Sequence, residues 1–163
     1  MKVGDAAQVS AALGATFKPV KGLRINANWR WYDQLYARFD PIAFDSSLQT
    51  ATYTPPALEK GALRLPSYNL FDLGASYKFE LGGRQSLILG ANVYNLFDTT
   101  YISEATTNNH TDLKASNFTG TPAQQATALA NYNAQGTWKG IHQSNSVYFG
   151  FGRTWAANIT FHF

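Results

Sequence analysis

The amino-acid sequence predicts an all-β protein, built as an antiparallel up-and-down meander of about five long strands. Apolar and polar residues alternate over five stretches of the 163-residue chain, which is typical of strands with one apolar and one polar face. Only 14% of the residues are charged and 15% are aromatic, whereas an average domain is about 25% charged. No apolar run reaches the ~18 residues that a transmembrane helix needs. Strands are therefore the main predicted elements.

The first two strands are predicted at about residues 8–18 and 23–38. The second shows the alternation most clearly, in the segment LRINANWRW. Its apolar face holds Leu23, Ile25, Ala27, Trp29 and Trp31, and its polar face holds Arg24, Asn26, Asn28 and Arg30. A shift of one residue would place the arginines on the apolar face, so the pattern specifies the register strongly.

Three further strands are predicted at about residues 67–79, 86–98 and 146–163. The first of these alternates from Phe71 to Phe79, and Asp72 falls on its polar face. The last one alternates up to the final residue of the sequence. Its apolar face holds Trp155, Ala157, Ile159, Phe161 and Phe163.

The connections between the predicted strands are alternately short and long. Pro19–Gly22 and Glu80–Gln85 are short segments rich in turn residues. Residues 39–66 and 99–145 form long loops, and Thr121 followed by Pro122 predicts a short helix in the second one. All short turns thus lie at one end of the sheet, as in outer-membrane barrels with short periplasmic turns and long extracellular loops.

A soluble β-sandwich would show the same alternation, but three features favour part of a transmembrane β-barrel. The strands reach or approach the ~9–11 residues that a tilted strand needs to cross a bilayer. The face opposite the apolar one is polar, as a water-lined lumen would be. Aromatic residues gather near both strand ends, as in the two aromatic girdles of a barrel. They are Trp29, Trp31, Tyr32 and Tyr36 toward the long loops, and Phe17, Tyr77, Phe79, Phe161 and Phe163 toward the short turns. The predicted location is the outer membrane of a Gram-negative cell, with lipid against the apolar face.

No pattern in the sequence indicates an enzyme, a metal site or a cofactor. The net charge is only +3 and the basic residues are scattered, which argues against nucleic acid as a partner. The chain has no cysteine, and its Ser, His and Asp residues show no nucleophile-elbow pattern. His110 and Asp112 lie in a long loop and are expected to be solvated there. His142 has no partner at a diagnostic spacing, and His162 falls on the polar face of the last strand.

The polar face offers the best candidates for contact with a solute. Side chains that donate and accept hydrogen bonds suit sugars, peptides or chelates. The candidates are Arg24, Asn26, Asn28, Arg30 and Asp72. We prefer to interpret the same residues as a polar wall, because a barrel is polar wherever it faces water. The loop residues Tyr53, Tyr132 and Trp138 are further candidates for stacking on a ligand.

Three segments resemble late barrel strands of TonB-dependent outer-membrane receptors. NVYNLFDTTY (Asn92–Tyr101) resembles the N-L-F-D…Y segment near the end of these receptors, and LPSYNLFDLGASYKF (Leu65–Phe79) resembles one of their late strands. GRTWAANITFHF (Gly152–Phe163) is similar to their closing strand, in which an arginine and an aromatic residue precede an alternating strand that ends in Phe. The segments occur in the order of the family, and the loops resemble those of its Bacteroidota branch.

The resemblance implies energised uptake of a scarce solute, such as a siderophore, an oligosaccharide or a peptide. It implies the barrel-assembly machinery as a partner, which would recognise Trp155, Ala157, Ile159, Phe161 and Phe163. Other implied partners are the plug and earlier strands of the receptor and, through the plug, TonB. The sequence shows no plug and no signal peptide, and five strands cannot close a membrane-sized barrel. We therefore expect a C-terminal portion of a longer receptor, with Met1 as an internal or artificial start.

Two alternatives stay open. One is a small independent outer-membrane β-barrel, completed by strands hidden in the long loops or by oligomerisation. The other, which the three features above disfavour, is a soluble all-β binding module whose aromatic residues would be buried between sheets.

Overall fold

The computed structural model describes Gly4, residues 6–38 and residues 60–163. In these residues the protein is mostly β, with antiparallel strands in a sheet, which confirms the predicted all-β class. The chain divides into two compact units. We call Ser10–Tyr32, Ser67–Tyr101 and Gly150–Phe163 the strand unit, and the described residues of Met1–Val9, Asp33–Pro66 and Ile102–Phe149 the loop unit. None of the helices in the described residues is long and apolar enough to cross a membrane.

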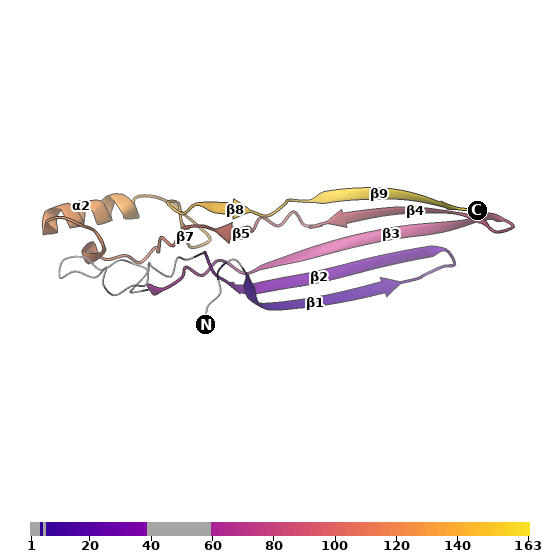
Figure 1. The fold of residues 1–163 in the computed structure, drawn as a ribbon, viewed down its shortest axis with the longest axis horizontal. Coiled ribbons are helices and arrows are strands. Elements are labelled where there is room, and N and C mark those ends of the chain that lie inside the picture. The colour runs from indigo at the N-terminus through magenta and orange to yellow at the C-terminus, as the bar shows by residue number, and fades with distance from the viewer. Residues whose placement is uncertain (1–3, 5, 39–59) are drawn as a thin grey trace. The chain divides into compact units, whose positions relative to one another are not determined.

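The strand unit is a five-stranded sheet in the order β1-β2-β3-β4-β9 (Figure 1). The strands are β1 (Ala7–Phe17), β2 (Leu23–Leu35), β3 (Tyr68–Gly82), β4 (Gln85–Tyr94) and β9 (Thr154–His162). β2 pairs antiparallel with β3, β3 with β4, and β4 with β9. In the described residues β1 and β9 are the two edges, and the sheet is not closed into a barrel.

The register lines up residues of one kind across the sheet. One row runs from Leu23 through Tyr77 and Leu89 to Ile159. The next residue on each strand belongs to the opposite face, because side chains alternate along a strand. That face has a row from Arg24 through Ser76 and Gly90 to Asn158. The alternation seen in the sequence therefore becomes one apolar and one polar face of a continuous sheet.

Several strand bounds differ from the sequence-based prediction. β2 ends at Leu35 rather than near residue 38, and β3 continues to Gly82 rather than 79. Two further differences concern β4 and the last predicted strand. β4 ends at Tyr94 rather than near residue 98, because Asn95 and Asp98 adopt left-handed conformations with φ of 51° and 53°. The strand expected at 146–163 is two strands, β8 (Val147–Phe149) and β9, with residues 150–153 between them. Strict alternation carries no signal for either interruption, so both were missed.

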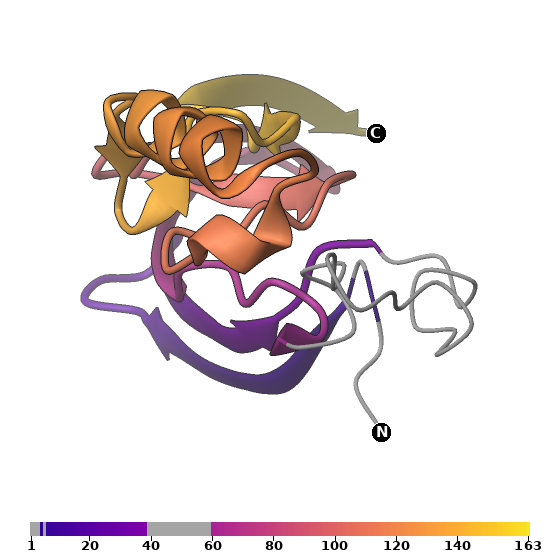
Figure 2. The same ribbon diagram turned by 90° about the vertical axis from the view of Figure 1, so that its left-hand side faces the viewer.

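The loop unit contains short elements within the residues predicted as a long loop. β5 (Ile102–Ala105) pairs with β8, and β6 (Thr137–Trp138) pairs with β7 (Ile141–His142). Helix α2 (Pro122–Asn133) begins at the predicted cap: Thr121 Oγ1 accepts from the Gln124 N–H at 3.4 Å, and Gln124 Oε1 accepts from the Thr121 N–H at 2.8 Å. α2 lies beside the 3-10 helix η3 (Ala115–Asn117) in the view of Figure 2.

Buried apolar residues are concentrated in the loop unit. Those in the described residues are Leu35, Ala37, Ala62, Leu63, Leu65, Ile102, Ala105 and Ile141 in the loop unit, and Leu70 in the strand unit. The strand unit instead carries large apolar side chains that are exposed, on β1, β3, β4 and β9. The sheet therefore has almost no buried core of its own.

Candidate solute-binding site on the polar face

Arg30, Asp72 and Asn95 link three segments of the strand unit. Arg30 Nη2 donates a hydrogen bond to Asp72 Oδ2 at 2.5 Å, and the backbone N–H of Asn95 donates to Asp72 Oδ1 at 3.0 Å. Asp72 lies directly across from Asn28, so its carboxylate reaches diagonally to Arg30. The charges of Arg30 and Asp72 offset each other, and both carboxylate oxygens are engaged. The pair is therefore fixed in place and carries no net charge.

The turn after β4 is shaped by the buried side chain of Asn95. Its Nδ2 donates to the carbonyl oxygens of Thr99 at 3.0 Å and Phe151 at 3.2 Å, and its Oδ1 accepts from the Thr99 N–H at 2.9 Å. Asparagine also tolerates the left-handed backbone better than most residues. Because backbone groups use both donors and the acceptor of this amide, Asn95 positions the turn rather than offering contacts to a ligand.

A second anchor of this region is the ring of Tyr101. It stacks on Tyr68 with 4.2 Å between ring centroids, and Tyr68 lies 5.0 Å from the ring of Tyr32. The Gly150 N–H donates to the Tyr101 carbonyl at 2.9 Å, and a Cβ at Gly150 would overlap the Tyr101 ring. Burial raises the pKa of the Tyr101 phenol. Tyr101 is therefore neutral and is packed against a position that only glycine fits.

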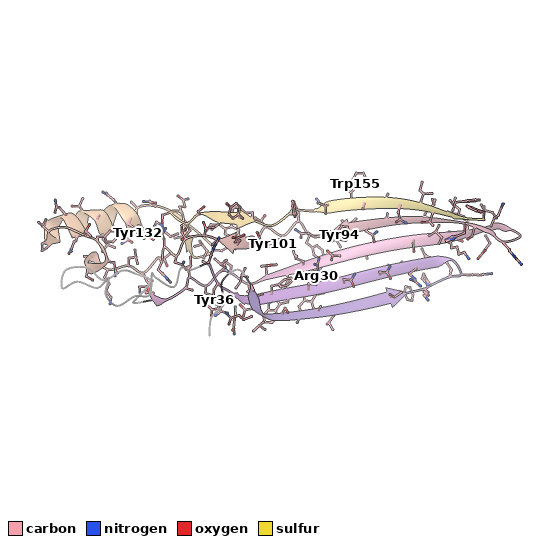
Figure 3. All side chains as sticks on the ribbon, viewed as in Figure 1. Arg30, Tyr36, Tyr94, Tyr101, Tyr132 and Trp155 are labelled. Carbon is pink, nitrogen blue, oxygen red and sulfur yellow. The ribbon has the colours of Figure 1, made fainter. Side chains whose placement is uncertain are left out.

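A hollow of about 400 Å³ lies between these groups, which is within the usual size range of small-molecule sites. Figure 3 labels Arg30, Tyr94 and Tyr101, which come from β2, the end of β4 and the segment that follows it. Phe151, which precedes β9, and Thr154, its first residue, also line the hollow. Phe151 is 86% exposed. The Nε–H of Arg30 is buried and has no acceptor in the described residues. The hollow is thus lined by aromatic rings and by the Arg30 side chain, whose Nε–H is itself inaccessible to solvent.

The structure separates the five predicted solute contacts. Arg30 and Asp72 form the ion pair at the hollow, and Asn28 lies opposite Asp72. Asn26 Oδ1 accepts from the Thr16 hydroxyl at 2.9 Å. Arg24 lines a different hollow, of about 610 Å³, beside the β1–β2 turn. The five residues share the polar face, but they do not form one cluster.

Three asparagines on the polar face lie over glycines of a neighbouring strand, a feature that the sequence analysis missed. Asn92 is directly opposite Gly74, and Asn158 is directly opposite Gly90. A Cβ on either glycine would overlap the Oδ1 atom of that asparagine, and a Cβ on Gly14 would lie 2.9 Å from Asn28 Oδ1. We call Asn28, Asn92 and Asn158 the amide belt. It covers the sheet with uncharged groups that both donate and accept hydrogen bonds.

The residues proposed for recognition by the assembly machinery share the apolar face of β9. Trp155, Ala157, Ile159 and Phe161 lie opposite Val93, Ala91, Leu89 and Leu87 of β4. Phe163 follows the end of β9 and packs against Phe161, with 6.2 Å between ring centroids. These side chains form a continuous apolar row along an edge strand.

The histidine and acidic candidates of the loop unit point to separate partners. His110 Nε2 lies 3.0 Å from the Gly61 carbonyl oxygen, while Asp112 Oδ2 accepts from Lys60 Nζ at 2.6 Å. The hydrogen bond from Lys60 lowers the pKa of Asp112. Across residues 6–38 and 60–163, no group of three His, Cys, Asp or Glu side chains is placed to hold a metal ion.

The structure also shows a role for His142 that the sequence did not indicate. Its ring stacks flat on Tyr132, with 3.7 Å between centroids, and its Nε2 lies 2.9 Å from the Tyr132 carbonyl oxygen. The Tyr132 hydroxyl donates to the His110 carbonyl at 2.9 Å. Tyr132 is thus used within the loop unit, and Trp138 packs edge-on against Phe149. Tyr53 lies outside the described residues.

Comparison of the chain with protein-family models, with curated proteins and with solved structures finds no match.

Proposed function

We propose that the strand unit is part of the wall of an outer-membrane β-barrel. The observation that carries the proposal is a single sheet with an uncovered apolar face and an uncovered polar face. Trp155 and Ile159 on the apolar face are 79% and 75% exposed. Soluble proteins rarely leave such a large apolar surface in water, whereas lipid would cover it. Water would then face the polar side.

The spacing of aromatic residues on the apolar face supports this proposal. Phe71 and Phe79 lie on one face of β3, about 26 Å apart at ~3.3 Å per residue. Trp29 lies opposite Phe71, and the row through Phe79 continues to Phe161. Aromatic residues therefore mark both ends of an apolar band. In a barrel whose strands tilt by ~35–45°, this band would be about 19–22 Å high, slightly less than the ~25 Å apolar band of outer-membrane barrels.

The open edges of the sheet also fit a barrel wall. Unpaired backbone groups on β1 and β9 would be too costly in lipid. We infer that further strands pair with both edges, and that the apolar row on β9 is what the barrel-assembly machinery recognises.

We further propose that the chain belongs to a TonB-dependent receptor that takes up a scarce solute. Two of the segments that resemble this family contact each other. Asn95 Nδ2 donates a hydrogen bond to the Phe151 carbonyl, and Asp98 Oδ1 accepts one from the Arg153 N–H. In such a receptor, external loops capture the solute, and TonB displaces a plug to let it pass. The polar face of the strand unit would line that passage.

A matched pair of substitutions on β4 tests the membrane proposal. Leu89 lies on the apolar face and its neighbour Ile88 on the polar face. Leu89 pairs with Tyr77, between the middle of the apolar band and its Phe79 end. We therefore expect Leu89→Arg to weaken insertion into lipid vesicles by ~1–2 kcal/mol, and Ile88→Arg to have a much smaller effect. Equal effects of the two substitutions would contradict the assignment of the faces.

The receptor proposal is tested in the source organism. Outer-membrane fractions would be probed with an antibody raised against residues 99–145. We expect a surface-accessible band much heavier than the 18.0 kDa of this chain, and solute uptake that stops when TonB is removed. A membrane band at 18.0 kDa would instead favour a small independent barrel, and absence from the membrane would favour a soluble binding module.

A further inference from the structure

We propose that the hollow beside the β1–β2 turn binds a ligand that carries two or more phosphate groups. This hollow has a volume of about 610 Å³, which is within the usual range of small-molecule sites. Four basic side chains line it, and none of the described residues around it is acidic. The four are Lys18, Lys21, Arg24 and Lys78. We call it the basic hollow. The inference goes beyond the proposed function, because it concerns the turn end of the sheet and not the passage of a solute.

The β1–β2 turn packs directly on β3 at one of these cations. The Lys78 N–H donates a hydrogen bond to the Gly22 carbonyl oxygen at 2.9 Å. Gly22 has a φ of 89°, and a Cβ there would lie 2.6 Å from the Lys78 carbonyl oxygen. Glycine therefore allows this close approach, since a side chain would be strained and would press on the backbone of β3. The approach places Lys18 and Lys21, which follow β1, at the same hollow as Lys78.

Most of the positive charge in the basic hollow is not neutralised by a carboxylate. Lys78 Nζ lies 3.0 Å from Glu80 Oε1, but both side chains are largely exposed, and exposed pairs contribute little. Within residues 6–38 and 60–163, no ion pair joins Lys18, Lys21 or Arg24 to an acidic group. Like charges around one hollow repel each other, and this repulsion costs free energy. A bound anion would replace the repulsion with attraction.

The groups in the basic hollow suit phosphate better than carboxylate. The planar guanidinium of Arg24 can donate two parallel hydrogen bonds to phosphate oxygens, and lysine is a common phosphate-binding residue. Ser76 lies directly opposite Arg24 and also lines the hollow, so its hydroxyl is a further donor. A carboxylate carries one negative charge, whereas a ligand with two phosphate groups carries at least two. Such a ligand therefore matches several unpaired cations.

A ligand of this chemistry has two sources. One is a soluble diphosphate, and the other is a phospholipid whose headgroup contains two phosphate groups. The β1–β2 turn lies at the same end of the sheet as the β3–β4 turn (Figure 1). A barrel wall would bring this end of the strands to the level of the lipid headgroups. Both sources would present the same groups to the basic hollow, and the test distinguishes them.

The test uses the protein purified in a neutral detergent from its source organism. Phosphorus NMR would follow the binding of pyrophosphate in solution and of cardiolipin carried in the detergent micelles. Citrate and hexaglutamate would be added as competitors that carry carboxylates only.

Two matched pairs of variants would then be compared. Arg24→Gln removes a charge from the basic hollow, whereas Arg84→Gln removes the same charge from the β3–β4 turn, outside the hollow. Ser76→Asp places a negative charge opposite Arg24, and Ser76→Asn adds a side chain of the same size without that charge.

We expect pyrophosphate, cardiolipin or both to bind, and more weakly as salt is added. Arg24→Gln and Ser76→Asp should each weaken binding about tenfold, while Arg84→Gln and Ser76→Asn should change it by less than about threefold. Binding of pyrophosphate alone supports a soluble ligand, and binding of cardiolipin alone supports a lipid headgroup.

Three results would overturn the inference. They are binding of neither phosphate probe, equal weakening by Arg24→Gln and Arg84→Gln, and binding of citrate or hexaglutamate as tight as that of the phosphates. Because membrane insertion is measured separately, a membrane protein that binds no phosphate would refute this inference and leave the proposed function standing.

Discussion

Asp98 Oδ1 accepts a hydrogen bond at 2.8 Å from the backbone N–H of Arg153. Asp98 lies in the turn after β4 and has a φ of 53°, and its own N–H donates to the Asn95 carbonyl at 2.9 Å. Arg153 immediately precedes β9. This contact therefore joins the end of one strand to the start of its neighbour, across a long intervening segment of sequence.

Substitutions of Asp98 distinguish what its hydrogen bond contributes to the unfolding free energy from what its charge contributes. Asp98→Asn keeps an acceptor and tolerates the left-handed backbone, so we expect a loss of unfolding free energy below ~1 kcal/mol. Asp98→Ala loses both features and should cost about 2 kcal/mol. Urea titrations of the protein in lipid vesicles would measure the difference. Equal losses for the two variants would show that the side-chain acceptor contributes nothing.

Asn95 provides a sharper test of the same turn. Asn95→Asp has nearly the same shape, but it replaces the amide donor to Thr99 and Phe151 by an oxygen that faces their carbonyls. We expect a loss of about 3 kcal/mol or more, because a buried charge and unmet acceptors result. Asn95→Ala should be less harmful than Asn95→Asp in the same urea titration. The reverse order would mean that the amide donors are not important.

The sequence predicts the sheet well but not the contacts that shape the hollow. Alternation fixes which residues share a face, so Arg30 and Asp72 could both be placed on the polar face. Their contact depends on the register between β2 and β3, which a long connection separates and no turn type specifies. β4 ends before Asn95 because Asn95 has a left-handed backbone, and the spacing of apolar residues does not indicate such a conformation. The overlay of Asn92 on Gly74 likewise appears only once the strands are paired.

The close contact between Gly150 and Tyr101 predicts a strong coupling. Gly150→Ala would force the Tyr101 ring away from its stack on Tyr68, and we expect it to cost about 1–3 kcal/mol. In a background with Tyr101→Ala, the added methyl group meets no ring and should cost much less. A double-mutant cycle on the unfolding free energy measures this coupling. Additive effects would contradict the contact.

His142 is held in a single tautomer by its neighbours. The Ser144 N–H donates to Nδ1 at 3.1 Å, and Nε2 lies 2.9 Å from the Tyr132 carbonyl oxygen, which can only accept. We therefore expect nitrogen NMR to show Nδ1 as the hydrogen-bond acceptor and the proton on Nε2. His142→Phe keeps the stacking on Tyr132 but leaves the Ser144 N–H without this acceptor. Hydrogen exchange at Ser144 should then be at least about tenfold faster, while exchange in β3 should not change.

The ion pair between Lys60 and Asp112 predicts how the loop unit responds to acid. The hydrogen bond from Lys60 lowers the pKa of Asp112 below its ordinary value of 3.8. Because the folded-state pKa is the lower one, this pair stabilises the fold fully above that ordinary value, which applies to the unfolded chain. Its contribution is lost as the pH falls through the folded-state pKa. The effect should stay below ~1 kcal/mol, since the Asp112 side chain is 70% exposed. A carbon NMR titration of the Asp112 carboxyl should show its pKa rising to the ordinary value in Lys60→Met. An unchanged titration curve in that variant would show that Lys60 is not the cause of the shift.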